Sequence, residues 1–195
     1  MSRTLYVARH GQTEANVARR YPGHRETPLT EIGREQARTM GRALRRELGA
    51  HPTLKFVASP LGRAQATMRL IRVELDLPPD GFASDARLLD IDHGDWTGLT
   101  NDEVRARFPE NFAQHTSGKW DVRMRGGESY ADLAARVRSF LDDLASDAVT
   151  VSHGATSQML RGLACGMETA KIVELPETQG VVFRVRDKMI AQLDS

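Results

Sequence analysis

The sequence predicts an α/β fold, a three-layer α/β/α sandwich around a mainly parallel central sheet. Short apolar runs of the kind that fill buried strands alternate with longer segments whose apolar residues recur at helical spacing. This alternation is typical of a parallel sheet covered by helices on both faces. With 195 residues, 40% of them hydrophobic, the chain is expected to form one domain over residues 1–195.

The first predicted strand is the apolar run 5–8, which is followed directly by Arg9 and His10. Thr13 is expected to cap a helix that runs to about Arg20. A cation and an imidazole therefore lie between the carboxyl end of a strand and the N-terminus of a helix. Open α/β sheets bind their ligands at this edge, and a helix N-terminus favours anions.

The second predicted helix has Thr30 as its N-cap and runs through about Leu48, where Gly49 closes it. A polar loop with two prolines precedes it. The residues of its expected apolar face are Ile32, Ala37, Met40, Leu44 and Leu48.

The second predicted strand, residues 56–58, leads into a third helix. Ser59 is a good N-cap and Pro60 suits the first helical position, so this helix is expected to run to about Leu75. Arg63 then falls in its opening turns, within reach of a ligand held at that end of the helix.

The middle of the chain changes in composition. Residues 86–90 are expected to form a short strand or an extended loop, and residues 94–127 are polar, with a short helical patch at 101–108. We expect 94–127 to be an insertion over the ligand site rather than a second domain. Ser129 then caps a helix whose apolar face consists of Leu133, Val137, Phe140, Leu141 and Leu144.

The last part of the chain repeats the pattern of a strand, a polar pair and a helix. Residues 149–152 form a predicted strand, His153 follows it, and the next helix runs to Cys165. Residues 181–185 and 189–191 are expected to form a closing hairpin.

Composition excludes several classes of function. The 27 Lys and Arg residues nearly balance the 26 Asp and Glu residues, so bulk charge predicts no nucleic-acid or membrane partner. Cys165 is the single cysteine and cannot form an internal disulfide. No run approaches membrane-spanning length and no signal peptide precedes the first strand, so a cytoplasmic protein is expected. A homodimer is one possible oligomeric state, because two-fold dimers are the commonest soluble oligomers.

Three predicted strand ends supply matching chemistry, in the form of Arg9, His10, Arg63 and His153. A single histidine at a strand end is usually structural, but its recurrence beside arginines favours a ligand site. Arginine offers bidentate hydrogen bonds and fixed charge to a phosphomonoester dianion. These four residues therefore suit a single phosphate site.

These residues carry a resemblance to a known family. Arg9-His10-Gly11, the Arg63 segment and Ser152-His153-Gly154, in that order, resemble the histidine phosphatase superfamily, also called phosphoglycerate mutase-like. The likeness covers nearly the whole chain and implies the same α/β architecture. The segment 21–33 looks like the small bacterial branch that includes α-ribazole phosphatase and broad-specificity phosphatases.

The resemblance implies a catalytic role for four residues. His10 matches the family's nucleophile, whose neutral imidazole attacks phosphorus and forms a phosphohistidine. Arg9, Arg63 and a protonated His153 would stabilise charge on the phosphoryl oxygens. This chemistry calls for no metal and no cofactor, and the sequence has no convincing metal-ligand cluster.

The family also carries an acid, usually glutamate, that protonates the leaving oxygen. In the matching segment 88–98 this position is Asp90, which departs from the common pattern by one methylene. Asp92 and Asp95 are alternative acids. Asn16, Gly23 and Gly154 match family positions near the bound phosphate, and with Arg9, Arg63 and His153 they form the predicted substrate-binding set.

Phosphatases and mutases of this family share the phosphohistidine step. The segment 94–127 looks short and lacks an adjacent arginine pair of the mutase type, although it contains scattered basic residues. A phosphatase that hydrolyses a small phosphomonoester is therefore the favoured prediction. The alternatives are a cofactor-dependent phosphoglycerate mutase-type phosphotransferase and a catalytically weak phosphate-ligand binding or regulatory protein, the latter motivated by Asp90 alone.

Overall fold

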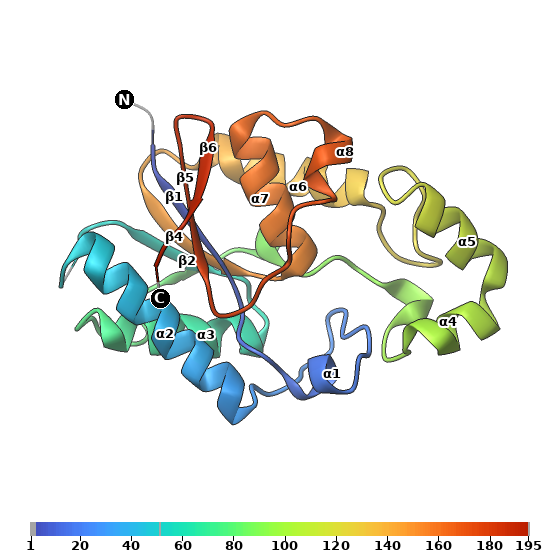
Figure 1. The fold of residues 1–195 in the computed structure, drawn as a ribbon, viewed down its shortest axis with the longest axis horizontal. Helices are drawn as coiled ribbons and strands as arrows, with labels where there is room; N and C mark the ends of the chain where they lie inside the picture. Colours follow the sequence, from blue (N-terminus) through green and yellow to red (C-terminus); the bar gives the residue numbers. More distant parts are fainter. Residues whose placement is uncertain (1–2, 51, 195) are drawn as a thin grey trace.

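The central sheet is mainly parallel, as predicted. The computed structural model describes residues 3–50 and 52–194. Within those residues the sheet has six strands in the order β3-β2-β4-β1-β5-β6 (Figure 1). Strands β1 to β4 are joined by parallel pairs, whereas β5 and β6 add an antiparallel hairpin beside β1. The strands are β1 (Leu5–Arg9), β2 (Lys55–Ala58), β3 (Ala83–Ser84), β4 (Ala148–Ser152), β5 (Val182–Arg186) and β6 (Met189–Gln192).

The register of the parallel strands brings three strand ends level. Arg9 lies opposite Ser152, and the backbone N–H of His10 donates to the carbonyl of Ser152 at 2.9 Å. The N–H of Ser59 donates to the carbonyl of Val151 at 3.0 Å. The polar residues that follow β1, β2 and β4 therefore meet at one edge of the sheet, where a doubly covered parallel sheet binds ligands.

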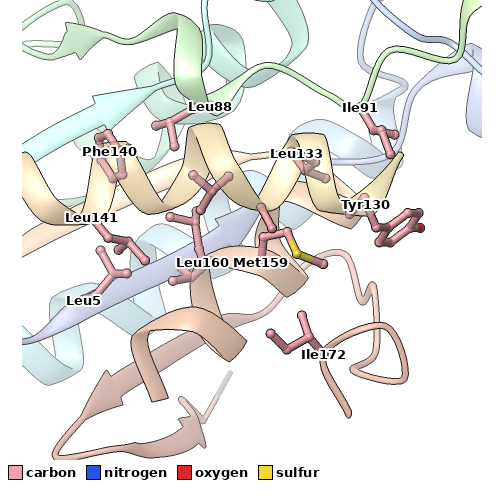
Figure 2. Close-up of a cluster of buried hydrophobic side chains, with 14 of the residues drawn as sticks. Leu5, Leu88, Ile91, Tyr130, Leu133, Phe140, Leu141, Met159, Leu160 and Ile172 are labelled. Atoms are coloured by element: carbon pink, nitrogen blue, oxygen red, sulfur yellow. The ribbon is translucent and has the colours of Figure 1, made fainter. Parts of the chain in front are cut away.

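Helices cover both faces of the sheet. In β1, Tyr6 and Ala8 face a core that they share with α2 and α3, whereas Leu5 and Val7 face α6 and α7. Figure 2 shows the second of these cores, where α6 and α7 pack over Leu5. The helices are α1 (Glu14–Val17), α2 (Glu31–Leu48), α3 (Gly62–Glu74), α4 (Asn101–Arg107), α5 (Pro109–Ser117), α6 (Tyr130–Asp143), α7 (Gly154–Cys165) and α8 (Thr169–Ile172), with short 3₁₀ turns at Ala86–Leu88 and Gly94–Trp96.

Three helix caps agree with the predictions, and the first is Thr13, which starts α1 in a capping box with Asn16. The Thr30 side chain accepts a hydrogen bond from the N–H of Gly33, and α2 ends at Leu48 with Gly49 at its C-cap. Ser129 and Asp132 form a reciprocal capping box that starts α6. The apolar face of α2 is also as expected except for Ile32, which is 61% exposed because it lies on the outer side of the first turn.

Two predicted boundaries are wrong. Helix α1 ends at Val17 rather than near Arg20. Helix α3 starts at Gly62 with Leu61 as its N-cap. The Ser59 hydroxyl is bonded to a histidine of the site and accepts from the N–H of Leu61, which lies before the helix. Of the two alternatives for residues 86–90, the strand is wrong: they form a 3₁₀ turn followed by a loop, and the short parallel strand β3 precedes them.

The loop after β1 lies directly on the first turn of α2. A Cβ atom on Gly11 would lie 2.1 Å from the carbonyl oxygen of Gly33, and one on Gly33 would lie 2.0 Å from that of Gln12. Both positions therefore require glycine. The contact fixes the loop that follows the strand, and with it the residues at the strand end.

Segment 94–127 forms α4, α5 and their connections, which lie to one side of the sheet (Figure 1). Among the helices of the described residues, none has the length and apolar character that a membrane crossing requires.

Candidate active site

A cavity of about 470 Å³ opens at the carboxyl edge of the sheet. Five residues predicted for the site line it, namely Arg9, His10, Asn16, Asp90 and Gly154. The segment 94–127 contributes Trp96, Asn101, Phe112, His115, Thr116, Lys119 and Met124 to the same wall. The structure thus brings residues from distant parts of the chain around one opening.

His10 is almost fully buried, with 1% of its surface exposed. Its Nδ1 lies 2.7 Å from the carbonyl oxygen of Gly11, which can only accept, so Nδ1 carries the proton and Nε2 keeps its lone pair. Burial, followed by the positive charges of Arg9 and Arg63, lowers the pKa of His10 well below its usual value. The ring is therefore neutral and has one nucleophilic nitrogen near neutral pH.

His153 lies behind His10, with ring centroids 5.1 Å apart. The Nε2 of His153 is 2.8 Å from the Ser59 hydroxyl, and its Nδ1 is 3.8 Å from Asp90 Oδ2. The nearby carboxylate favours a proton on Nδ1, with Ser59 donating to Nε2. Burial, then the charges of His10 and Arg63, lowers the pKa of His153 well below its usual value. His153 is therefore neutral in this state, contrary to the protonated form expected from the sequence.

These two buried histidines predict a loss of stability in mild acid. Because their folded-state pKa values are lowered, the unfolded chain binds protons that the native chain cannot accept as pH falls below about 6.5. Each ring then costs about 1.4 kcal/mol per pH unit until its folded pKa is reached. Denaturant titrations between pH 7.5 and 5 should show this decline, with a shallower slope in His153→Asn. Equal stability at both ends of the range would contradict the neutral assignment.

Arg63 is buried and is not among the residues that line the cavity. Its guanidinium donates to the carbonyl oxygens of Gly23 at 2.8 Å and Arg25 at 2.9 Å, and to Asp90 Oδ2 at 3.1 Å. Gly23 has φ +53°, and a Cβ there would meet Thr97 Oγ1 at 2.7 Å. Gly23 therefore positions Arg63 through its carbonyl and does not itself line the cavity.

Asp90 is 6% exposed, and both of its oxygens accept hydrogen bonds. Oδ2 is bonded to Arg63, and Oδ1 accepts the N–H of Ile91 at 3.0 Å. Neither alternative acid is among the cavity-lining residues. Asp92 accepts the N–H of Gly94, and Asp95 pairs with an exposed arginine. Asp90 is therefore the acid that this fold presents to the site from the predicted segment.

Asn16 and Arg9 both line the cavity. The side-chain oxygen of Asn16, Oδ1, completes the α1 capping box by accepting from the N–H of Thr13. It also accepts from Gln179 Nε2 at 3.0 Å. Arg9 Nη1 donates to the backbone carbonyl of Glu177 at 2.6 Å. Asn16 thus has a structural role in addition to its place in the wall.

Three buried nitrogens of the site lack a hydrogen-bond partner. The buried Nε of Arg9, Nε of Arg63 and Nδ1 of His153 have no hydrogen-bond partner among the described residues. A buried donor without a partner costs about 1–3 kcal/mol, so such a group signals an expected ligand. All three belong to residues predicted to hold phosphate.

The outer part of the cavity is rich in rings. Tyr21 lies 4.8 Å from His93 and 5.7 Å from Trp96 between ring centroids, and Trp96 is 5.8 Å from Phe112. Trp96 Nε1 and His93 Nδ1 are buried without a hydrogen-bond partner among the described residues. This side of the cavity therefore offers apolar faces with two unused polar atoms.

The sequence reasoning missed three residues of the site. Ser59 was interpreted as a helix cap, whereas it fixes His153. Glu177 and Gln179 come from the connection between α8 and β5, and both contact residues next to the nucleophile. No local pattern marks these two, because only the tertiary fold brings their loop to the strand ends.

The described residues contain no cluster of three or more His, Cys, Asp or Glu side chains suited to hold a metal ion. A histidine at the floor, two arginines, a second histidine and a carboxylate instead give the site a nucleophile, anion-binding groups and a proton-transfer group. This arrangement suits the transfer of a phosphoryl group.

Comparison with known proteins gives consistent matches. The model of the histidine phosphatase superfamily (branch 1) matches residues 5–189. A Chelativorans sp. (strain BNC1) protein named 2,3-bisphosphoglycerate-dependent phosphoglycerate mutase is 34% identical over 194 residues, which cover 95% of this chain and 93% of that protein.

Solved structures resemble the chain over nearly its whole length. The alpha-ribazole phosphatase from Shigella flexneri has a TM-score of 0.81 and 26% identity, covering 98% of this chain and 96% of its own. A mycobacterial glucosyl-3-phosphoglycerate phosphatase in complex with VO3 has a TM-score of 0.79 and 28% identity, covering 98% and 97%.

Proposed function

Because the chain belongs to the histidine phosphatase superfamily, we propose that it is a metal-independent phosphomonoesterase that acts on a small phosphorylated metabolite. Its relatives make it a phosphatase or phosphotransferase enzyme. The observation that carries the finer proposal is the set of three unpartnered nitrogens around a neutral, oriented His10.

In the first step, Nε2 of His10 attacks phosphorus as the bond to the leaving oxygen breaks. The leaving oxygen takes a proton from Asp90, and the phosphoryl group becomes bonded to His10. Arg9, Arg63 and His153 would donate hydrogen bonds to the equatorial oxygens, which carry the charge in the transition state.

In the second step, water attacks the phosphohistidine. Asp90 accepts a proton from the water, the bond between phosphorus and Nε2 breaks, and inorganic phosphate leaves. Asp90 is then protonated and His10 neutral, so the cycle closes without another reactant.

A mutase-type phosphotransferase is the second candidate, because relatives of 34% identity carry that name. A mutase must hold a second anionic group of its substrate. Of the residues that the structure describes, Lys119 is the one cation of segment 94–127 that lines the cavity. Arg123 and Arg125 of this segment pair with Asp132 and Asp95 instead. Segment 94–127 thus offers a single cation at the cavity for a second anionic group, which favours the phosphatase over the mutase.

The two candidates differ in what happens to phosphate. With EDTA present and no bisphosphate primer, we expect release of inorganic phosphate from a panel of phosphorylated metabolites and acid-labile labelling of the protein. A mutase would instead interconvert 3- and 2-phosphoglycerate only after priming with 2,3-bisphosphoglycerate, and total phosphoester would be conserved. Primer-dependent isomerisation without phosphate release would reverse the proposal.

A further inference from the structure

The connection between α8 and β5 is held firmly against α7. Gln158 Nε2 donates to the carbonyl of Leu175, and Arg161 Nη2 donates to that of Pro176, both at 2.5 Å. Gln158 and Arg161 are both buried. These two hydrogen bonds therefore fix the position of the backbone at residues 176–179, which follows beside the cavity.

The same connection is bonded to the site. Arg9 Nη1 donates to the carbonyl of Glu177 at 2.6 Å, and Gln179 Nε2 donates to the carbonyl of His10 at 3.1 Å and to Asn16 Oδ1 at 3.0 Å. Glu177 thus lies between two fixed neighbours. Glu177 lines the cavity and its side chain is partly exposed.

In the structure the Glu177 carboxylate lies among the anion-binding groups. Its Oε2 is 3.6 Å from Arg9 Nη1 and 2.0 Å from where a Cβ on Gly154 would be. Gly154 is the first residue of α7, and the His153 side chain caps none of the free amides there. Burial, and after it the charge of Glu177, raises the pKa of Tyr21 and Tyr130, so the carboxylate acts across the cavity wall.

We propose that Glu177 is an internal competitor of phosphate, whose carboxylate pairs with Arg9 beside the first residue of α7, in place of a phosphoryl oxygen, and must leave when the ligand enters. The side chain is 40% exposed, so it can swing into solvent without breaking the backbone contacts. A phosphate dianion and the Glu177 carboxylate repel each other across this short distance.

The inference rests on the proposed function, because it assumes that phosphate binds at His10. Its consequence is a site from which inorganic phosphate departs readily, since the carboxylate returns to Arg9 as the product leaves. Fast departure suits a hydrolase. It would hinder a mutase, which must retain a bisphosphate intermediate during transfer.

The test is equilibrium binding of inorganic phosphate by calorimetry to the full-length chain and three variants. Glu177→Gln removes the charge and keeps the shape, and Glu177→Ala removes both. Glu174→Gln is the matched control, because Glu174 is exposed in the same connection and does not line the cavity. We expect the phosphate Kd to fall about tenfold in both Glu177 variants and to stay unchanged in the control.

Binding that is equal or weaker in the Glu177 variants overturns the proposal, as does the absence of phosphate binding in every protein. The readout does not depend on turnover. Tighter binding in the variants of a chain that hydrolyses nothing would support the role of Glu177 and refute the proposed hydrolase. Normal hydrolysis with unchanged phosphate binding in the variants would support the proposed hydrolase and refute the role of Glu177.

Discussion

Replacement of His10 by alanine is expected to abolish turnover, with a loss of about 10⁴-fold or more in kcat. In the proposed mechanism His10 supplies the attacking nitrogen, because its Nδ1 is bonded to the carbonyl oxygen of Gly11 and its Nε2 keeps a lone pair at the cavity. Phosphate release and acid-labile labelling should disappear together. Thermal unfolding of the variant controls for a simple loss of structure.

His153→Ala is the informative comparison. His153 lies behind His10 and contacts Ser59 and Asp90. Its loss should lower kcat by about 10²–10³-fold, as for a removed oxyanion donor, yet the labelled phosphohistidine should still form. If the phosphohistidine label persisted in His10→Ala and disappeared in His153→Ala, then His153 would be the nucleophile and His10 the supporting residue.

The second large effect is expected for Asp90→Asn, which removes the proton donor. Hydrolysis of alkyl phosphates should slow by about 10²–10⁴-fold, because an alkoxide needs a proton in order to leave. p-Nitrophenyl phosphate should lose much less, since its leaving group is stable as an anion. The measurement is kcat/KM for both esters in the wild type and the variant.

Asp95→Asn is the matched control, because Asp95 is an exposed acid near the mouth that pairs with Arg125 and does not line the cavity. It should leave both rates unchanged. Asp90 also binds Arg63, so its replacement can weaken phosphate holding. Equal losses for the two esters would show that the anchoring of Arg63, and not proton donation, accounts for the effect.

The parts of the fold that follow from local pattern were predictable. Arg9, His10 and His153 sit at strand ends because short apolar runs precede them, and the parallel register then brings those ends level. Thr30 and Ser129 marked their helix starts by side-chain capping, which is a local interaction. The hairpin of β5 and β6 was likewise visible in its alternating apolar residues around Asp187 and Lys188.

What escaped prediction depends on distant parts of the chain. Ser59 has the chemistry of a helix cap, but a buried hydroxyl beside His153 makes a different hydrogen bond once β2 and β4 pair. Asp90 could be placed by resemblance, whereas its bonds to Arg63 and to the Ile91 amide needed the fold. Glu177 could not be found, because loop composition does not reveal which strand end a loop contacts.

The order of the strands has a consequence for the synthesis of the chain. Strand β1 carries the nucleophile at its end, and it pairs Leu5 with Ala148 on one side and Val185 on the other. During synthesis β1 therefore emerges well before either of its partner strands. Such high contact order slows folding and leaves β1 exposed to misassembly while it waits. The residues at the end of β1 are thus brought into the candidate site late in folding, after β4 and the β5–β6 hairpin have taken their places in the sheet beside β1.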